Sequence, residues 1–186
     1  SNVIISARGM LNDQAFSVKP VKKKIYLTLA KLFRLYTNVS WHATNEIEAD
    51  QIKTRIGLNS RVKIAPNLAR KGQIEYEQIE LQKPVRLVNV ARIAKEKGTL
   101  KMLKALQKVS TPLILDIYGS IYDQYYWKQC LEIISAMPDF IKVNYKGVAR
   151  SEDIPIVLRG YNFFVMLSEG ENFGHSILEA LSVGLP

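Results

Sequence analysis

A short segment near the end of the chain, EGENFGHSILEA at residues 169–180, sets acidic side chains around a turn that opens a helix. Three residues begin the helical pattern: Gly174, His175 and Ser176. Their backbone amides are expected to point at an anion such as a phosphate, with the helix dipole adding to the attraction. Glu171 precedes the turn and Glu179 lies about one turn into the helix, so both carboxylates can accept hydrogen bonds from hydroxyl groups beside that anion. The alternative for Glu179 is structural, because acidic residues are favoured near helix N-termini in any case.

Two cations occupy a second segment, VARIAKEKGTL at residues 90–100. Arg92 follows an apolar run typical of a strand, and Lys97 comes just before a helical pattern. Fixed cations at the carboxyl end of a strand can neutralise a leaving diphosphate without a metal, because they stabilise negative charge as it develops. A sugar nucleotide carries a diphosphate, which cations can bind, and sugar hydroxyl groups, which carboxylates can bind. The two segments together supply both kinds of side chain. A solvated charged loop, which also contains Lys95 and Glu96, is the alternative.

These candidate residues lie between elements that alternate regularly from residue 85 onward. Four runs rich in Val, Ile, Tyr and Phe are predicted strands: Val85–Ala91, Leu113–Tyr118, Ile141–Tyr145 and Asn162–Leu167. Each is followed by a helical pattern: Leu100–Val109, Tyr122–Met137, Ser151–Leu158 and His175–Val183. Ser151 is the expected N-terminal cap of the third helix. The alternation predicts βαβ units and a Rossmann-like parallel sheet, in which ligands bind at the carboxyl ends of the strands.

The first 66 residues show a weaker form of the same alternation. The expected elements are Val3–Ser6, a long basic helix at Pro20–Tyr36, Val39–Ala43, Glu46–Ile56 and Val62–Ala65. Residues 67–84 are polar and end in a proline, which is typical of a linker. We therefore expect a partial Rossmann-like lobe at 1–66, a linker at 67–84 and a second lobe at 85–186. We also expect a fragment, because the chain starts at a bare strand and stops where the next strand is due.

The composition is that of a globular protein with a sizeable core, since 47% of the residues are apolar and 23% are charged. The longest apolar runs, such as Phe163–Leu167, are far below the roughly 18 residues that cross a bilayer, and no signal-peptide pattern opens the chain. A single cysteine, Cys130, cannot form an internal disulfide, which favours the cytoplasm. The two histidines, His42 and His175, lack ligand-spaced partners, so no metal site is expected.

The net charge of +9 lies in the first part of the chain, where residues 1–100 carry 18 Lys and Arg against 8 Asp and Glu. This asymmetry fits nucleic acid, an anionic membrane surface or a phosphate-bearing ligand. Residues 21–36 mix basic and apolar side chains, which fits peripheral contact with a membrane; a core-facing apolar stripe with a solvated basic side is the alternative. Nucleic acid is not expected, because aromatic and basic residues are not interleaved. His42 beside Trp41 is interpreted as a packing residue, with the base of a hydrolytic triad as the alternative.

Two segments carry a resemblance to a known family: ARIAKEKG at residues 91–98 and EGENFGHSILEALSVGLP at 169–186. They resemble the family-four glycosyltransferases of GT-B fold, whose Glu-x7-Glu motif opens with Glu-x-Phe-Gly and ends with Glu-Ala. The match to that motif comprises Glu171, Asn172, Phe173, Gly174, Glu179 and Ala180. SARGML at 6–11, HATNEIEA at 42–49 and VKIAPN at 62–67 are similar to the late acceptor-side lobe of the same enzymes.

The resemblance implies a role for each candidate residue. Glu171 contacts the donor hexose, Glu179 holds the ribose, and Arg92 with Lys97 binds the diphosphate. The donor-binding residues also include Phe173, Gly174, His175 and Ser176 of the motif, the backbone around Val148, which reads the base, and Gly119, which approaches the donor.

The function so implied is retaining, metal-independent transfer of a hexose from a UDP-, GDP- or ADP-sugar to a saccharide or lipid-linked acceptor. The nucleotide sugar is a substrate, so no cofactor is expected, and the place of action is the cytoplasm, with contact at the inner membrane face left open. One alternative is a nucleotide-sugar epimerase or hydrolase on the same fold. The other is a basic polyanion-binding protein, which the charge of residues 1–100 alone supports.

Overall fold

The computed structural model describes residues 3–17, 20–68, 83–171 and 174–186, and it divides the chain into two compact units, residues 1–68 and 69–186. The division falls within the expected linker at 67–84, most of which lies outside the described residues. Among the described residues, no helix has both the length and the apolar character that a membrane span needs.

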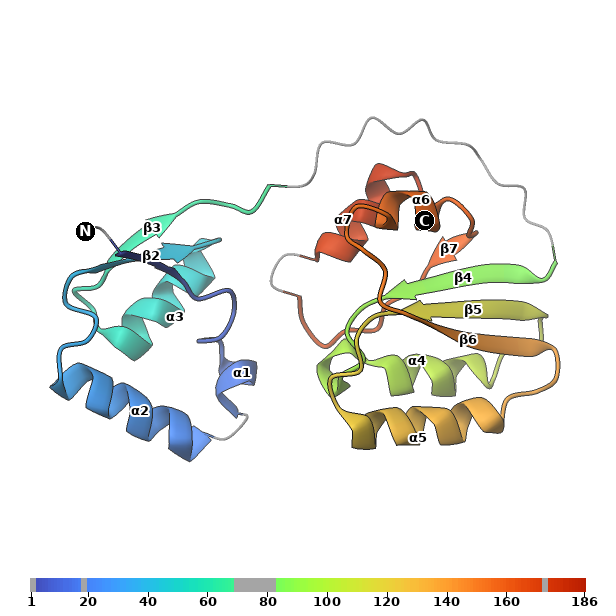
Figure 1. Cartoon of the computed structure of the whole chain (residues 1–186), viewed down its shortest axis with the longest axis horizontal. Coiled ribbons are helices and arrows are strands. Elements are labelled where there is room, and N and C mark those ends of the chain that lie inside the picture. Colours follow the sequence, from blue (N-terminus) through green and yellow to red (C-terminus); the bar gives the residue numbers. More distant parts are fainter. Residues whose placement is uncertain (1–2, 18–19, 69–82, 172–173) are drawn as a thin grey trace. The chain divides into compact units, whose positions relative to one another are not determined.

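Unit 1 is a small, wholly parallel sheet with helices beside it (Figure 1). Its strands lie side by side in chain order: β1 (Val3–Ser6), β2 (Val39–Ala43) and β3 (Arg61–Ile64). Its helices are α1 (Asp13–Ser17), α2 (Pro20–Leu32) and α3 (Glu46–Ile56). Trp41 and Ala43 of β2 pack against Ala49 and Ile52 of α3, which forms the core of this unit.

The buried carboxylate of Glu48 holds the loop after β1 against the start of α3. Its two oxygens accept hydrogen bonds from the backbone amide of Gly9 at 2.7 Å and from the amide and hydroxyl of Thr44, each at 2.7 Å. Burial alone would raise the pKa of Glu48, but these hydrogen bonds outweigh it and hold the pKa below its ordinary value. Asn45 caps the same helix by accepting a hydrogen bond from the Glu48 amide at 2.8 Å.

The basic helix α2 ends at Leu32, one turn before the predicted end at Tyr36. Arg34 adopts the left-handed conformation with a φ of 52°, and the Leu35 amide donates to the carbonyl of Ala30 at 3.0 Å. Such a left-handed residue followed by a bond back into the last turn is a common helix terminator. Apolar periodicity continues past Leu32 and therefore overestimates the helix.

Unit 2 is built on a second parallel sheet, whose strand order is β6-β5-β4-β7. The strands are β4 (Val85–Val90), β5 (Leu113–Tyr118), β6 (Ile141–Gly147) and β7 (Phe163–Phe164). The chain moves outward from β4 through β5 to β6 and then returns to place β7 on the other side of β4. This is the strand order of one half of a Rossmann fold, and the predicted fold class is confirmed.

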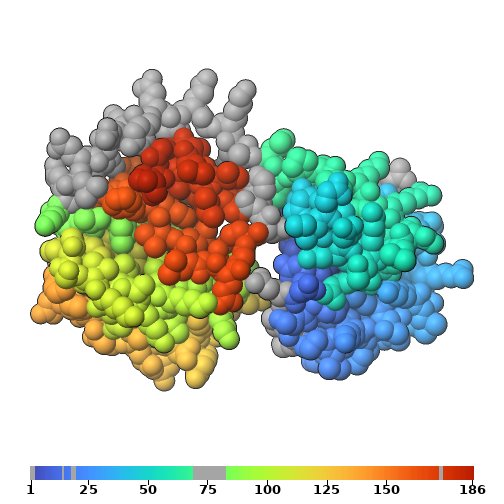
Figure 2. All heavy atoms as spheres, turned by 180° about the vertical axis from the view of Figure 1, so that it is seen from behind, coloured from blue at the N-terminus to red at the C-terminus, as the bar shows by residue number. Residues whose placement is uncertain are grey.

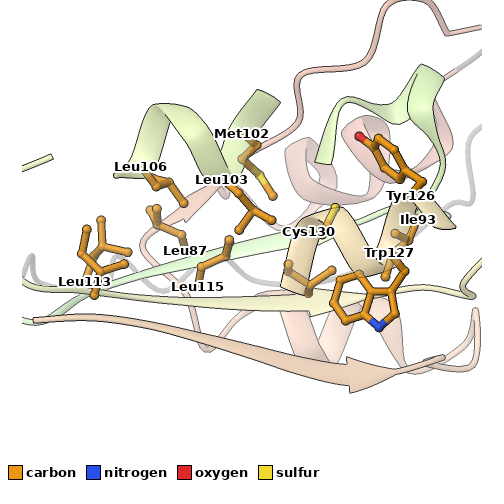
Figure 3. Packing of buried hydrophobic residues seen from close by; sticks show 12 residues of the cluster. Leu87, Ile93, Met102, Leu103, Leu106, Leu113, Leu115, Tyr126, Trp127 and Cys130 are labelled. Carbon is orange, nitrogen blue, oxygen red and sulfur yellow. The ribbon is translucent and has the colours of Figure 1, made fainter. Parts of the chain in front are cut away.

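Helices cover both faces of this sheet, with α4 and α5 on one face and α6 and α7 on the other (Figure 1). Their bounds are α4 (Thr99–Leu106), α5 (Gln124–Ser135), α6 (Ile154–Leu158) and α7 (His175–Ser182), and a short 3-10 helix, η1 (Lys95–Lys97), precedes α4. Leu87 and Leu115 of the sheet pack against Leu103 of α4 and Trp127 of α5 (Figure 3). Cys130 is buried among them, and burial raises the pKa of its thiol to about 11, so it is an inert core residue.

Several element boundaries in unit 2 differ from the predictions, and two of these differences concern α6 and β7. The expected helix cap at Ser151 is wrong, because α6 begins at Ile154 with Pro155 in its first turn, where a proline fits without losing a hydrogen bond. The predicted last strand spans Asn162–Leu167, but β7 pairs only through Phe163 and Phe164. The Val165 amide still donates to the Val88 carbonyl of β4 at 2.9 Å, and the chain beyond Val165 packs against the segment that follows β4.

Two polar side chains lie buried within the apolar strands. The Asp116 carboxylate of β5 accepts hydrogen bonds from the Tyr161 hydroxyl and from the Asn144 amide, both at 2.7 Å. The Asn89 amide of β4 donates to the carbonyl of Val165 at 2.6 Å. These bonds fasten the turn before β7 and the segment after it to the centre of the sheet, and so they fix where that segment leaves it.

Candidate functional site

The strand order of unit 2 reverses between β4 and β7, which are direct neighbours. In parallel sheets the two connections leaving such a switch point run to opposite faces and open a crevice at the carboxyl ends of the strands. The segment after β4 contains Arg92 and Lys97, and the segment after β7 contains Glu171 and leads into α7. The candidate residues from these two distant parts of the sequence are therefore placed at one edge of the sheet.

Lys97 and Glu171 form a direct ion pair across this edge. The Lys97 Nζ lies 2.6 Å from the Glu171 Oε1, and the two side chains are only 17% and 21% exposed. Lys97 is the last residue of η1, and Glu171 lies between β7 and α7, so the pair joins the two segments at the switch point. A charge-assisted hydrogen bond of this length holds both side chains in a defined position.

A second ion pair lies on the same two segments. Lys101, on α4, places its Nζ 2.5 Å from the Glu169 Oε1. The hydrogen bond from Lys101 holds the pKa of the Glu169 carboxyl below its ordinary value, although the carboxyl is exposed to solvent. The Glu169 amide also donates to the carbonyl of Glu96 at 2.9 Å, so backbone as well as side chains joins the two segments.

Gly98 permits the close approach of these segments. Its φ is 70°, and a Cβ at this position would lie 1.9 Å from the carbonyl oxygen of Leu167. The left-handed conformation and the contact with backbone both require a residue without a side chain. The contact sets Lys97, immediately before Gly98, within reach of Glu171.

Arg92 lies at the carboxyl end of β4 but takes different partners. Its Nη2 is 3.4 Å from the Glu96 Oε1, and its guanidinium carbon is 5.2 Å from the centre of the Tyr122 ring. The side chain is 52% exposed. The fold thus brings Lys97 to Glu171 and leaves Arg92 beside Tyr122, from where its long side chain can rotate without disturbing the core.

The start of α7 follows directly after this site. Gly174 is the N-terminal cap residue, in the left-handed conformation, and it offers no side chain to bond the first amides of the helix. His175 is exposed, whereas Ser176 and Glu179 are half-buried, with Glu179 in the second turn. Phe173 lies outside the described residues.

Gly119 and Val148 lie at the carboxyl ends of the next two strands. The Gly119 amide donates to the Gly147 carbonyl at 2.8 Å, and the Tyr145 hydroxyl donates to the Gly119 carbonyl at 2.9 Å. A Cβ on Gly119 would lie 1.9 Å from the carbonyl oxygen of Ala91, so this glycine allows the segment after β4 to run close beside the segment after β5. Val148 directly follows β6 and is exposed.

His42 in unit 1 links its three strands. The ring Nδ1 lies 2.9 Å from the Ser6 hydroxyl at the end of β1, and the Nε2 lies 2.8 Å from the carbonyl oxygen of Ala65, just after β3. The carbonyl can only accept, so Nε2 carries a proton, and in the neutral ring Nδ1 accepts from the Ser6 hydroxyl. The ring therefore bridges the carboxyl ends of the three strands.

The site in unit 2 offers donors for an anion and acceptors for hydroxyl groups. Lys97 supplies a fixed cation and Glu171 a carboxylate. The first amides of α7 follow Glu171 closely along the chain, and Glu179 lies in the second turn of that helix. Among the described residues, no group of three or more His, Cys, Asp or Glu is placed to hold a metal ion.

Three features of the site were missed from the sequence. Glu96 contacts both Arg92 and the segment after β7, Gly98 receives the backbone of Leu167, and the Lys101–Glu169 pair adds a second charged link. The glycine after a charged turn was a visible signal for Gly98. The other two depend on contacts between residues about seventy positions apart, which one sequence does not reveal.

The strand order and its switch point define a Rossmann-like α/β protein. The model of one family, the glycosyl transferases of group 1, matches residues 73–186. The chain belongs to this family.

Individual relatives agree with this assignment. The GtfA subunit of a UDP-N-acetylglucosamine–peptide N-acetylglucosaminyltransferase from Streptococcus gordonii is 30% identical over 117 residues, which are 61% of this chain and 22% of that protein. Among solved structures, HepE of Anabaena in complex with UDP-glucose aligns with a TM-score of 0.71 at 16% identity over 100% of this chain and 52% of its own. Sucrose-phosphate synthase of Thermosynechococcus elongatus aligns with a TM-score of 0.70 at 17% identity, over 98% of this chain and 48% of the synthase chain. The chain thus spans about a fifth of the curated relative and about half of the two structural ones.

Proposed function

We propose that this chain carries the donor-binding site of a retaining hexosyltransferase that uses a nucleotide-diphosphate sugar. The observation that supports this most strongly is the Lys97–Glu171 ion pair at the switch point, because it joins a cation and a hydroxyl acceptor from two distant segments. The diphosphate binds Lys97 and the first backbone amides of α7. The Arg92 side chain rotates away from Tyr122 and also contacts the diphosphate. Glu171 contacts the hexose and Glu179 the ribose.

Donor binding on this scheme is an exchange of partners. Without donor, Lys97 and Glu171 satisfy each other at 2.6 Å. When the donor enters, its diphosphate replaces Glu171 as the partner of Lys97, and the sugar hydroxyls replace Lys97 as the partners of Glu171. The ion pair therefore keeps both groups ordered until the donor binds. The contact between Lys97 and the diphosphate forms only then, and it stabilises the departing nucleotide diphosphate. Fixed cations in this role make a divalent metal unnecessary.

The proposed acceptor is a hydroxyl group of a saccharide or of a lipid-linked glycan. One structural relative with a TM-score of 0.56 is a lipopolysaccharide outer core galactosyltransferase, which is consistent with an acceptor of this class. A UDP-sugar is the first donor to test, because the curated relative is named for UDP-N-acetylglucosamine.

A thermal-shift panel with UDP-, GDP- and ADP-sugars tests the proposal. One of the three is expected to raise the unfolding midpoint of unit 2, since a ligand at a hundred times its Kd stabilises by about 2.7 kcal/mol. Glu179→Ala is expected to remove most of the shift, whereas Lys128→Ala, an exposed lysine on α5, is the matched control and should keep it.

The same panel distinguishes the alternatives. No shift with any nucleotide sugar, together with binding of heparin that salt abolishes, would favour a polyanion-binding protein. A shift with a nucleotide sugar that is then hydrolysed or epimerised even when saccharide acceptors are present would favour those reactions over transfer.

A further inference from the structure

Helix α2 of unit 1 presents a row of apolar side chains to solvent. Spacings of four, four and three residues place Val21, Ile25, Leu29 and Leu32, here called the α2 stripe, on one face of the helix. Their exposed fractions are 67%, 56%, 47% and 72%. Ala30, on the other side of the helix, is 1% exposed. The stripe is therefore exposed in the part of the chain that the structure describes.

In the space-filling view, blue atoms of this helix form part of the surface of unit 1 (Figure 2). Phe33 and Leu35, just beyond the end of α2, are 68% and 57% exposed and lengthen the apolar surface. Exposed apolar side chains gathered in this way mark a surface that packs against something.

Cations border the α2 stripe on both sides. On a helix, Lys24 and Lys31 fall along one side of the stripe and Lys22 along the other. Lys23 instead points toward α1, where it donates to the Ala15 carbonyl and its Nζ lies 5.8 Å from the centre of the Phe16 ring. The three bordering lysines are exposed.

Acidic residues are absent from this whole part of the sequence. Residues 14–45 contain six Lys or Arg and no Asp or Glu. If a second copy of this chain bound through its own α2 stripe, its bordering lysines would lie against the bordering lysines of the first copy. The repulsion between them disfavours self-association through this face. An anionic partner with an apolar layer beneath its charges matches both the stripe and its border.

We propose that α2 docks this protein on an anionic lipid surface. The α2 stripe inserts at the boundary between headgroups and acyl chains, and Lys22, Lys24 and Lys31 contact the lipid phosphates. This docking depends on the exposure and charge of unit 1 and not on the donor site, so it can hold even if the proposed transfer reaction fails. If both hold, docking brings the acceptor-side unit to the surface where a lipid-linked acceptor lies.

Vesicle co-sedimentation of the whole chain tests the proposal. The chain is expected to pellet with vesicles of phosphatidylcholine that contain about one third phosphatidylglycerol, and to remain in solution with pure phosphatidylcholine. The double variant Ile25→Glu/Leu29→Glu should lower the partition coefficient at least about 30-fold, because two apolar groups are replaced by charges that anionic lipid repels. Neutralising all three lysines with glutamine should lower it about 100-fold, at about 5-fold for each lysine near the surface.

Ile47→Glu is the matched control. Ile47 is as exposed as the stripe, at 71%, but lies on α3 between Glu46 and Glu48, so its replacement should leave vesicle binding unchanged. All variants alter exposed side chains, and circular dichroism checks that they stay folded. The proposal is overturned if the folded parent chain ignores anionic vesicles, or if Ile47→Glu weakens binding as much as the stripe variant. The parent chain could instead stay in solution with vesicles and form dimers that the Ile25→Glu/Leu29→Glu variant does not form. That result would assign the stripe to a protein partner.

Discussion

Replacing Gly98 by alanine is expected to lower the midpoint of thermal unfolding of unit 2 by about 10 °C, which corresponds to about 3 kcal/mol. Two costs add together. An alanine in the left-handed conformation costs about 1–2 kcal/mol. Its Cβ would also lie 1.9 Å from the Leu167 carbonyl oxygen, so that two backbone segments must separate, at a further cost of about 1–3 kcal/mol.

Two other glycines of unit 2 separate these costs. Gly147 has a φ of 76°, but a Cβ there would meet nothing within 4 Å, so Gly147→Ala should show the conformational cost alone. Gly160 has neither a positive φ nor a contact shorter than 3.7 Å, and Gly160→Ala should be nearly neutral. Fluorescence of Trp127 in a Trp41→Phe background reports on unit 2, since these are the two tryptophans of the chain. Equal midpoints for Gly98→Ala and Gly160→Ala would show that the segments after β4 and β7 do not meet at Gly98.

Replacing Lys97 by alanine is expected to weaken binding of the nucleotide sugar about 50-fold, because a charge-assisted hydrogen bond to the diphosphate contributes about 1.5–3 kcal/mol. Isothermal titration calorimetry measures the change directly. Lys101→Ala is the matched control: this lysine is four residues away and is also ion-paired, but with Glu169 and on the exposed side of α4. It should change the affinity by less than about 3-fold, as expected for an exposed pair.

Glu171→Gln gives the reciprocal test of the exchange of partners. The substitution releases Lys97 from its ion pair, so the nucleoside diphosphate without sugar should bind as well as before or better. The extra affinity that the hexose provides should fall, because an amide oxygen is a weaker acceptor than a carboxylate. Equal losses for nucleotide and nucleotide sugar would mean that Glu171 does not contact the hexose.

The fold of unit 2 could be predicted because its sequence is consistent at several levels. The buried strands β4 and β5 are near-continuous apolar runs, and a parallel sheet with short connections leaves few strand orders open. That topology alone places Lys97 and Glu171 at the same edge, because each follows the carboxyl end of its strand. The partner of Arg92 could not be predicted, since it depends on side-chain rotation and on the 3-10 turn that brings Glu96 near.

The orientation of α2 shows a different limit. Periodicity predicts that Val21, Ile25 and Leu29 share a face, but a helix with apolar residues on both sides does not reveal which side the rest of the protein covers. The pairing of Asp116 with Tyr161 was open to prediction in part, because a single acidic residue inside an apolar strand must find a buried donor. Which tyrosine supplies it depends on the path of the chain between α6 and β7.

The proposed function depends above all on a nucleotide sugar binding where the segments after β4 and β7 meet. Titration of the isotope-labelled chain with UDP-glucose, GDP-glucose and ADP-glucose, followed by amide NMR, tests this most directly. We expect at least one donor to shift the signals of Lys97, Gly98, Gly174 and His175 together, while those of β2 in unit 1 stay in place. If all three donors leave these four signals unmoved, or shift others instead, donor binding at this switch point is contradicted.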